Sequence, residues 1–385
     1  MKSAWPNYMV DRSCSVREVL LIQVFHSFSS GVLGVVIPLV MKNRGVEVVL
    51  MGFVFASMPL IMQLGRMFFA TISDFLGRKP FFTLNGFLGT VSSVIYYFAH
   101  TPMEFLFGKI AEGTKEGAIW AVNRAYILEK SRGDWRTLVN LRTVVYLAYA
   151  AGSQAAGFLM AFLLFEGTML LCALLGVLGV ILSLRLADER KGEFEVEKAL
   201  RFLDFRKKGW KFKVSLFLFF MMGLAFGFRG GYVIPYFLSS LGFSAEVVGL
   251  ILGVMILLAG LSAYVFSKCA HVRQLILVSG IIYSALFIPL GFSTPEAAAA
   301  LVIAVGFAEG MNSIGQEGVL SKICDRESYG TDIGLLMMGL HLGESASLAL
   351  SGVLIANWGF AASFVPAATL YTIFYLGVFM LYGER

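Results

Sequence analysis

The sequence predicts an all-α membrane protein with twelve transmembrane helices in two pseudo-symmetric six-helix bundles. Of its 385 residues, 58% are hydrophobic and only 15% are charged, whereas a soluble domain is nearer half apolar and a quarter charged. Long apolar stretches recur along the whole chain, and the second half repeats motifs of the first. These observations argue against a disordered protein, a nucleic-acid binder and an ordinary cytosolic enzyme.

Apolar stretches bounded by charged or turn residues predict the helices in order. A helix needs roughly 20 apolar residues to cross a bilayer, and twelve spans leave about 32 residues for each helix with its loop. The first six predicted helices cover residues 19–41, 47–72, 80–99, 103–128, 137–163 and 167–186. The second six cover residues 213–240, 245–268, 272–292, 295–321, 331–356 and 360–382.

One polar segment between the two sets divides the chain into four parts. These are an N-terminal segment 1–18, a six-helix bundle 19–186, a central loop 187–212 and a second bundle 213–385. Counted with the helix ends that flank them, the N-terminus, the alternate loops that follow and the C-terminus together hold 23 Lys and Arg residues, whereas the opposite loops hold only Lys42 and Arg44. By the positive-inside rule, both termini are predicted to be cytoplasmic in a multi-pass protein of the cell membrane.

The central loop carries apolar residues at helical spacing, followed by a basic stretch, residues 206–213. This pattern fits an amphipathic helix on the inner leaflet, with the basic stretch facing anionic lipid, and it also fits a solvated linker. We expect membrane lipid and a small organic solute as partners, no nucleic acid, and a monomer, because a twelve-helix chain with its own cavity needs no second copy.

The two halves repeat at a nearly constant offset. Residues 34–38, Gly52 and residues 111–113 recur 197 positions later as residues 231–235, Gly249 and residues 308–310. Residues 157–161 recur as residues 352–356, at an offset of 195. Six-helix halves repeated in one orientation are typical of transporters that work by rocking, alternating-access motions.

A charged motif lies between the second and third predicted helices, at residues 70–79. Asp74, Gly77, Arg78 and Lys79 match the signature G-x-x-x-D-[RK]-x-G-[RK]-[RK], which this segment closely resembles, of the major facilitator superfamily. The resemblance extends with the repeat over essentially the whole chain. It implies that this cluster, with Glu129 as a further acidic partner, holds the cytoplasmic gate closed. A basic loop that only sets topology is the alternative.

Two weaker motifs resemble the same family. Lys109 and Glu112 occupy the Arg and Gln positions of a motif R-x-x-Q-G in the fourth predicted helix. Gly152 and Gly157 begin and end a stretch similar to the antiporter motif G-P-x-x-G-G, with Ser153 in place of the Pro. These resemblances favour the drug and metabolite exporter branch.

Polar stripes lie on the first, fourth, seventh and tenth predicted helices at 100° per residue. The resemblance implies that these four helices line a central cavity, and each ionisable group there costs roughly 2.5–3.5 kcal/mol at the bilayer centre if left unpaired. The predicted cavity residues are His26, Lys109, Glu112, Lys115, Glu116, Trp120, Arg229, Tyr232, Glu309, Asn312 and Gln316.

Carboxylates such as Glu112 and Glu309 are predicted to bind protons, and a solute near Lys109, Lys115 or Arg229 would shift those protons. A structural alternative is that the charges of the fourth helix only pair with one another. Arg229 and Glu309 have opposite signs on two cavity helices and form a plausible ion pair, which is compatible with a transport role.

The sequence therefore predicts a secondary active transporter that moves a small organic solute by alternating access, coupled to protons and inclined to efflux of amphipathic, drug-like compounds. Proton-coupled uptake of an anionic metabolite or sugar is the alternative, and an intramembrane enzyme or a non-transporting sensor is a remote one. No hydrolase or phosphate-binding motif occurs, and the four cysteines lack ligand spacing. We thus expect no catalytic residue, metal or cofactor beyond the coupling proton.

Overall fold

The computed structural model describes residues 6–131, 136–186, 208–269, 272–324 and 329–382, and within these ranges it contains helices and turns but no strand. The helices are α1 (Pro6–Asn43), α2 (Val48–Leu76), α3 (Lys79–Phe98), α4 (Pro102–Lys130), α5 (Arg136–Leu184), α7 (Trp210–Arg229), α8 (Val233–Ser240), α9 (Ala245–Cys269), α10 (Val272–Leu290), α11 (Pro295–Ile323), α12 (Tyr329–Trp358) and α13 (Ala361–Tyr382). Most of the central loop lies outside the described residues, so its amphipathic helix stays a prediction.

Two of the predicted helix boundaries differ in the structure. The fifth and sixth predicted helices run together as α5, interrupted at Leu164, whose φ of 61° and ψ of 179° are not helical. The seventh predicted helix is broken into α7 and α8, because the chain turns at Gly231, where φ is +55°. Counting α5 as two spans and α7 with α8 as one, the described chain retains the twelve predicted spans.

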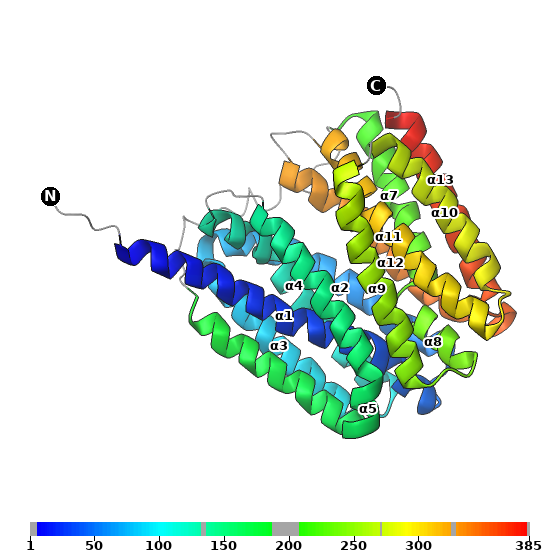
Figure 1. Cartoon of the computed structure of the whole chain (residues 1–385), viewed down its shortest axis with the longest axis horizontal. Coiled ribbons are helices and arrows are strands. Elements are labelled where there is room, and N and C mark those ends of the chain that lie inside the picture. The colour runs from blue at the N-terminus through cyan, green and yellow to red at the C-terminus, as the bar shows by residue number, and fades with distance from the viewer. Residues whose placement is uncertain (1–5, 132–135, 187–207, 270–271, 325–328, 383–385) are drawn as a thin grey trace.

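The helices form two bundles, α1–α5 and α7–α13, that lie side by side (Figure 1). The bundles pack mainly through two helix pairs, α2 with α12 and α5 with α9. The start of α1 and the end of α13 lie toward the same side of the molecule (Figure 1), which we call the terminal face. The end of α1 and the start of α2 lie at the opposite face.

The outer surface is apolar, as expected for a protein whose solvent is lipid. Large hydrophobic side chains are exposed on many helices, for example Phe162, Ile281 and Met380. Within the described residues, nine helices are long and apolar enough to cross a membrane. The helix α4 fails that test because of its charged side chains, and four of these point into the bundle, where they are only 2–6% exposed: Lys109, Glu112, Lys115 and Glu116.

Repeat-related glycines bring the two bundles together at the opposite face. An added Cβ at Gly157 of α5 would lie 2.3 Å from the Cα of Glu246 in α9, and one at Gly352 of α12 would lie 2.6 Å from the carbonyl oxygen of Val48 in α2. Gly52 of α2 and Gly249 of α9, which are equivalent in the repeat, pack in the same way against the backbones of α12 and α5. Close backbone packing of this kind requires residues without side chains.

Candidate functional site: a charged cavity between the two bundles

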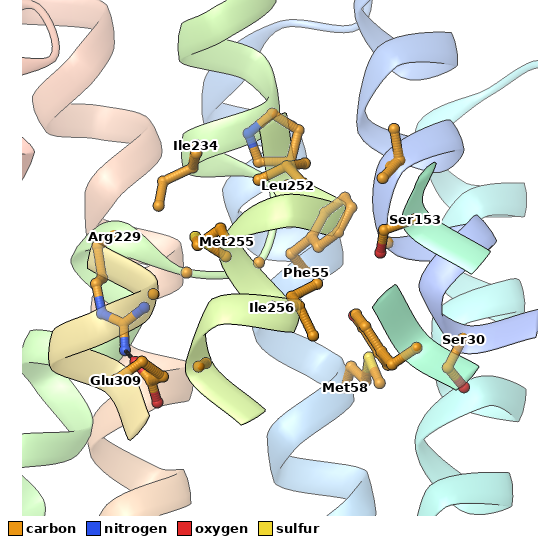
Figure 2. A pocket seen from close by; sticks show the side chains of 18 of the residues that line it. Ser30, Phe55, Met58, Ser153, Arg229, Ile234, Leu252, Met255, Ile256 and Glu309 are labelled. Carbon is orange, nitrogen blue, oxygen red and sulfur yellow. Dashed lines mark hydrogen bonds and ion pairs between the residues drawn. The ribbon is translucent and has the colours of Figure 1, made fainter. Parts of the chain in front are cut away.

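A cavity of about 430 Å³ lies between the bundles, with walls from both (Figure 2). Ser30, Met58 and Ser153 lie on the wall of the first bundle, and Arg229 and Glu309 lie on the wall of the second. Much of the remaining lining is apolar or aromatic. Its volume is in the range of about 300–1,000 Å³ that is usual for small-molecule sites.

The first charged group of the cavity is built on α4. The ammonium of Lys109 donates to Glu112 over 2.8 Å, and the hydroxyl of Tyr96 donates to the same carboxylate over 2.6 Å. Lys109 also lies over the ring of Phe55, 4.4 Å from its centroid. The side chains of the ion pair are 2% and 3% exposed. This pair is therefore compensated inside the protein, with only a small surface on the cavity.

The second group surrounds Glu116, one turn further along α4. Its carboxylate accepts hydrogen bonds from Ser30 over 2.9 Å and from the indole nitrogen of Trp120 over 2.9 Å. His26 lies 3.1 Å away, and the ammonium of Lys115 lies 3.8 Å away. Since these four groups from two helices surround one carboxylate, its hydrogen-bonding and ion-pairing needs are met inside the protein.

The hydrogen bonds of Asn85 determine which nitrogen of His26 carries the hydrogen. The amide nitrogen of Asn85 donates to the carbonyl oxygen of Lys115 over 3.1 Å and to Nδ1 of His26 over 3.0 Å. With Nδ1 as the acceptor, Nε2 of His26 carries the hydrogen that faces Glu116. His26 thus connects the cavity wall to a small second pocket behind it, which Asn85, Lys115 and Cys172 also line.

The third group lies between α7 and α8, where the seventh predicted helix is broken. Arg229 is the last residue of α7, and its guanidinium donates to Glu309 of α11 and to the hydroxyl of Tyr371 in α13. The hydroxyl of Tyr283 in α10 donates to the same carboxylate. The guanidinium lies 4.6–5.7 Å from the centroids of four aromatic rings: Phe226, Tyr283, Phe287 and Tyr371. The predicted ion pair of Arg229 with Glu309 is present, and Arg229 is 6% exposed.

A fourth ionisable pair belongs to α12. Glu344 lines the cavity, and its carboxylate lies 3.1 Å from Nδ1 of His341, one turn earlier. Tyr146 and Tyr149 of α5 complete the wall opposite. The sequence places Arg142, Tyr146, Tyr149 and Ser153 on one stripe of α5, and that spacing was the available sign of a cavity-facing side.

Five of the predicted cavity residues line the cavity, namely Lys109, Glu112, Glu116, Arg229 and Glu309. The others lie behind its wall. His26, Lys115 and Trp120 support Glu116, as described above, while Asn312 accepts from Tyr375 and Gln316 donates to the sulfur of Met222.

Tyr232 departs from its predicted orientation. Its hydroxyl lies 2.9 Å from that of Ser351 in α12, and its side chain is fully buried. A continuous helix would have put Tyr232 on the same stripe as Arg229. The turn at Gly231 changes that phase, so the prediction for Tyr232 was wrong for a backbone reason.

The motif of residues 70–79 forms a charged cluster at the terminal face. The guanidinium of Arg78 donates to Asp74 over 2.9 Å and to Glu129 of α4 over 3.1 Å. Lys79 donates to the carbonyl oxygen of Leu184 at the end of α5 over 2.7 Å. Gly77 permits the turn with a φ of +86°. These contacts tie α2, α4 and α5 together inside the first bundle.

A separate ion pair crosses between the bundles. Arg142 of α5 contacts Glu317 of α11, and Arg124 of α4 lies 3.9 Å from the same carboxylate. The sequence indicates only structural pairing for Arg142 and a position near a helix end for Glu317. Their spacing of 175 residues gives no sign that they meet.

The stretch that resembles the antiporter motif is a packing surface. An added Cβ at Gly152 would lie 2.1 Å from the carbonyl oxygen of Phe28 in α1, and Gly157 meets α9 as described. Ser153 lies between them and lines the cavity. The motif therefore brings α5 against one helix of each bundle.

A metal site is not evident in the described part of the chain, where no group of three His, Cys, Asp or Glu side chains converges. Cys172 and Cys324 are buried and form no disulfide. The side chains of Cys14 and Cys269 lie outside the described residues.

Solved structures of transporters share this fold. A mutant of the nucleoside transporter NupG superposes with a TM-score of 0.80 at 12% identity, over 95% of this chain and 99% of that one. The human organic anion transporter MFSD10 superposes with a TM-score of 0.72 at 15% identity, over 95% and 99% of the two chains. At such identities the similarity shows the fold alone.

The sequence also matches known families and proteins directly. The benzoate transport protein of Acinetobacter baylyi is 26% identical over 144 residues, which are 36% of this chain and only 30% of that relative. The family model of the Major Facilitator Superfamily matches residues 19–273 and 231–385. That model covers most of the chain, and the twelve-span fold agrees with it, so the chain belongs to the major facilitator superfamily of membrane transporters and is not an enzyme.

Proposed function

We propose that the chain is a secondary transporter that exports a small amphipathic organic solute in exchange for protons. The observation that carries this proposal is the cavity between the two bundles, which combines apolar walls with ionisable side chains. Four carboxylates line it, from Glu112, Glu116, Glu309 and Glu344, together with the permanent bases Lys109 and Arg229. A third base, Lys115, lies behind the wall beside Glu116. An excess of carboxylates favours protons and solutes with positive or no charge.

Alternating access would come from rocking of the two bundles about this cavity. The glycine contacts of α5 with α9 and of α2 with α12 would close the opposite face. On the terminal face, the pair of Arg142 with Glu317 would bridge the bundles, and the cluster around Asp74 and Arg78 would stabilise the helix ends. With the positive-inside rule, this terminal face is proposed to be cytoplasmic, in the cell membrane.

Transport in proteoliposomes tests the proposal. Purified protein is reconstituted, and a pH gradient of either sign is imposed while uptake of lipophilic cations, organic anions and sugars is measured. Export by proton exchange predicts that a cation accumulates on the acidic side, and that an ionophore which collapses the gradient abolishes accumulation. Movement of every solute at the same rate with and without the gradient would contradict proton coupling.

Uptake of an organic anion with a proton is the second candidate. Arg229 favours it, because one guanidinium nitrogen points into the cavity (Figure 2) beside the carboxylate of Glu309. A proton on Glu309 would free Arg229 for an anionic solute. The organic anion and benzoate transporters among the similar proteins are consistent with this candidate.

Ligand-dependent thermal unfolding in detergent separates the two candidates. A ligand at 100 times its Kd stabilises the folded state by about 2.7 kcal/mol. Stabilisation by a lipophilic cation supports export. Stabilisation by benzoate, lost in Arg229→Gln, would instead support uptake of an anion.

A further inference from the structure

Glu344 differs from the other carboxylates of the cavity in the kind of partner that it has. Glu112 pairs with Lys109, Glu309 pairs with Arg229, and Glu116 lies near Lys115 in addition to His26. The distinguishing partners are therefore Lys109, Arg229 and Lys115. Each of these partners is a permanent cation at neutral pH. Glu344 instead pairs with His341, which is charged only when it holds a second proton.

The charge balance of the cavity therefore depends on one pair. Glu112, Glu116 and Glu309 are matched by the three permanent bases named above. While His341 is neutral, Glu344 leaves one negative charge unmatched. Nδ1 of His341 faces the carboxylate over 3.1 Å. When the hydrogen of the neutral ring is on Nδ1, an added proton would go to Nε2 or to Glu344 itself. One proton neutralises the cavity.

Of the helices packed against α12, α7 carries Arg229, a permanent charge that lines the same cavity and is paired with Glu309. On α13, Tyr371 interacts electrostatically with Glu344 and also accepts the hydrogen bond from Arg229 of α7. On α7, Gly223 and Gly227 face the backbone of α12 at Glu344. On α2, the carbonyl oxygen of Ala56 accepts a hydrogen bond from Ser345, the residue after Glu344. The other ionisable side chains that line the cavity are Lys109, Glu112, Glu116, Tyr146, Tyr149, Arg229 and Glu309.

The same position is accessible to a solute. The side chain of Glu344 is 25% exposed, similar to 26% for Glu309 and well above 3% for Glu112 and 8% for Glu116. Aromatic and thioether side chains also line the cavity: Phe55, Met58, Tyr146, Tyr149 and Met255. Aromatic faces attract organic cations, and the effect grows when the cation is desolvated.

We propose that the pair of Glu344 with His341 is the exchange site of the transporter: it holds one proton in the empty cavity and releases it when an organic cation binds to Glu344. This inference rests on the proposed function and names its substrate class, amphipathic organic cations. The cation takes the place of the proton, so the net charge of the cavity is the same in both states. Proton and cation then exclude each other, which is the condition for exchange.

Calorimetric titration of the purified protein with tetraphenylphosphonium tests the site. Titrations in two buffers that differ in ionisation enthalpy measure the protons released. We expect about one proton per bound cation, and an affinity that falls as the pH is lowered, by at most tenfold per pH unit, because one proton competes. In Glu344→Gln we expect binding at least tenfold weaker, with no proton release and no dependence on pH.

Three further variants make the test decisive. Glu344→Asp keeps a carboxylate and is expected to restore proton release, which excludes a misfolded protein as the cause of the loss. His341→Gln is expected to change the pH dependence of binding while the cation still binds. Glu47→Gln, at an exposed position of the opposite face, is the matched control and is expected to behave as the wild type.

Proton release in Glu344→Gln equal to that of the wild type would overturn the assignment, and so would a wild type that binds no tetraphenylphosphonium between pH 5.5 and 8.5. Either result leaves the proteoliposome assay to decide the proposed function, because protons could exchange at Glu112 or Glu309. Conversely, proton release without any transport would refute the function and leave the binding site intact.

Discussion

At the scale of single residues, the charged side chains of the cavity compensate one another in pairs. Lys109 and Glu112 are almost completely buried, and the partner of each is the other. Removing one member of such a pair leaves an uncompensated charge, which costs about 3–5 kcal/mol, whereas replacing both is often nearly neutral.

This reasoning predicts the result of a double-mutant cycle. Glu112→Gln alone is expected to lower the free energy of unfolding by about 3–5 kcal/mol, while Lys109→Met with Glu112→Gln recovers most of that loss. Thermal unfolding in detergent measures both. If the double variant is stable and still transports, the pair has the structural role that the sequence left open. If it is stable and inactive, the charges act on the solute or the proton.

At the scale of helices, glycines decide how closely the two bundles approach. At Gly157 an added methyl group would meet the backbone of α9, which cannot move aside as a flexible side chain could. Overpacking of this kind costs about 1–3 kcal/mol.

Gly157→Ala is therefore expected to lower the apparent melting temperature and to weaken closure of the opposite face. The control is Gly209→Ala, since Gly209 has no atom within 4 Å of the added Cβ and an ordinary backbone conformation. Equal melting temperatures for the two variants would show that α5 and α9 accommodate the added methyl group without loss of stability.

The break between α7 and α8 is a second feature of the helices that depends on a glycine. Gly231 has a left-handed backbone, in which an L residue costs roughly 1–2 kcal/mol. An added Cβ would also lie 2.8 Å from the Cδ2 atom of Leu348. Gly231→Ala is expected to destabilise the protein by about that amount and to disturb the position of Arg229. A melting temperature and a ligand affinity equal to the wild type would argue against this role.

At the scale of the whole molecule, one carboxylate links the bundles near the terminal face. Glu317 contacts Arg142 and lies near Arg124, and the three side chains are 40–46% exposed. Exposed pairs contribute only about 0.2–1 kcal/mol. Such a contact can bias the two arrangements of a rocking transporter without locking either one.

Glu317→Gln is expected to open the terminal side of the cavity by a modest factor, roughly fivefold at most for 1 kcal/mol. The measurement is the labelling rate of a cysteine at Ala259, which lines the cavity, with a membrane-impermeant maleimide. Asp74→Asn provides the comparison within the first bundle. A labelling rate unchanged by Glu317→Gln would show that this pair does not gate the cavity.

Much of the fold could be predicted because the bilayer imposes strong rules on sequence. Apolar length predicts the spans, and the recurrence of glycines such as Gly52 and Gly249 predicts the two-fold organisation. Five of the residues that line the cavity were expected from helical phase together with the family resemblance, since a charge inside a membrane must point inward. Helical phase did not predict the orientation of Tyr232, because it assumes a continuous helix and the turn at Gly231 interrupts this one.

The sequence by itself determined the membrane class, the number of spans, the family and the helices on which the intramembrane charges lie, because each depends on composition or on spacing along one segment. The tertiary structure alone decided which charges compensate which. The partner of Arg142 comes from another helix, and so do Ser30 and His26 at the carboxylate of Glu116. Pairing across 175 residues leaves no periodic trace. For the same reason, Glu344 stands apart only when the partners of every other carboxylate are known.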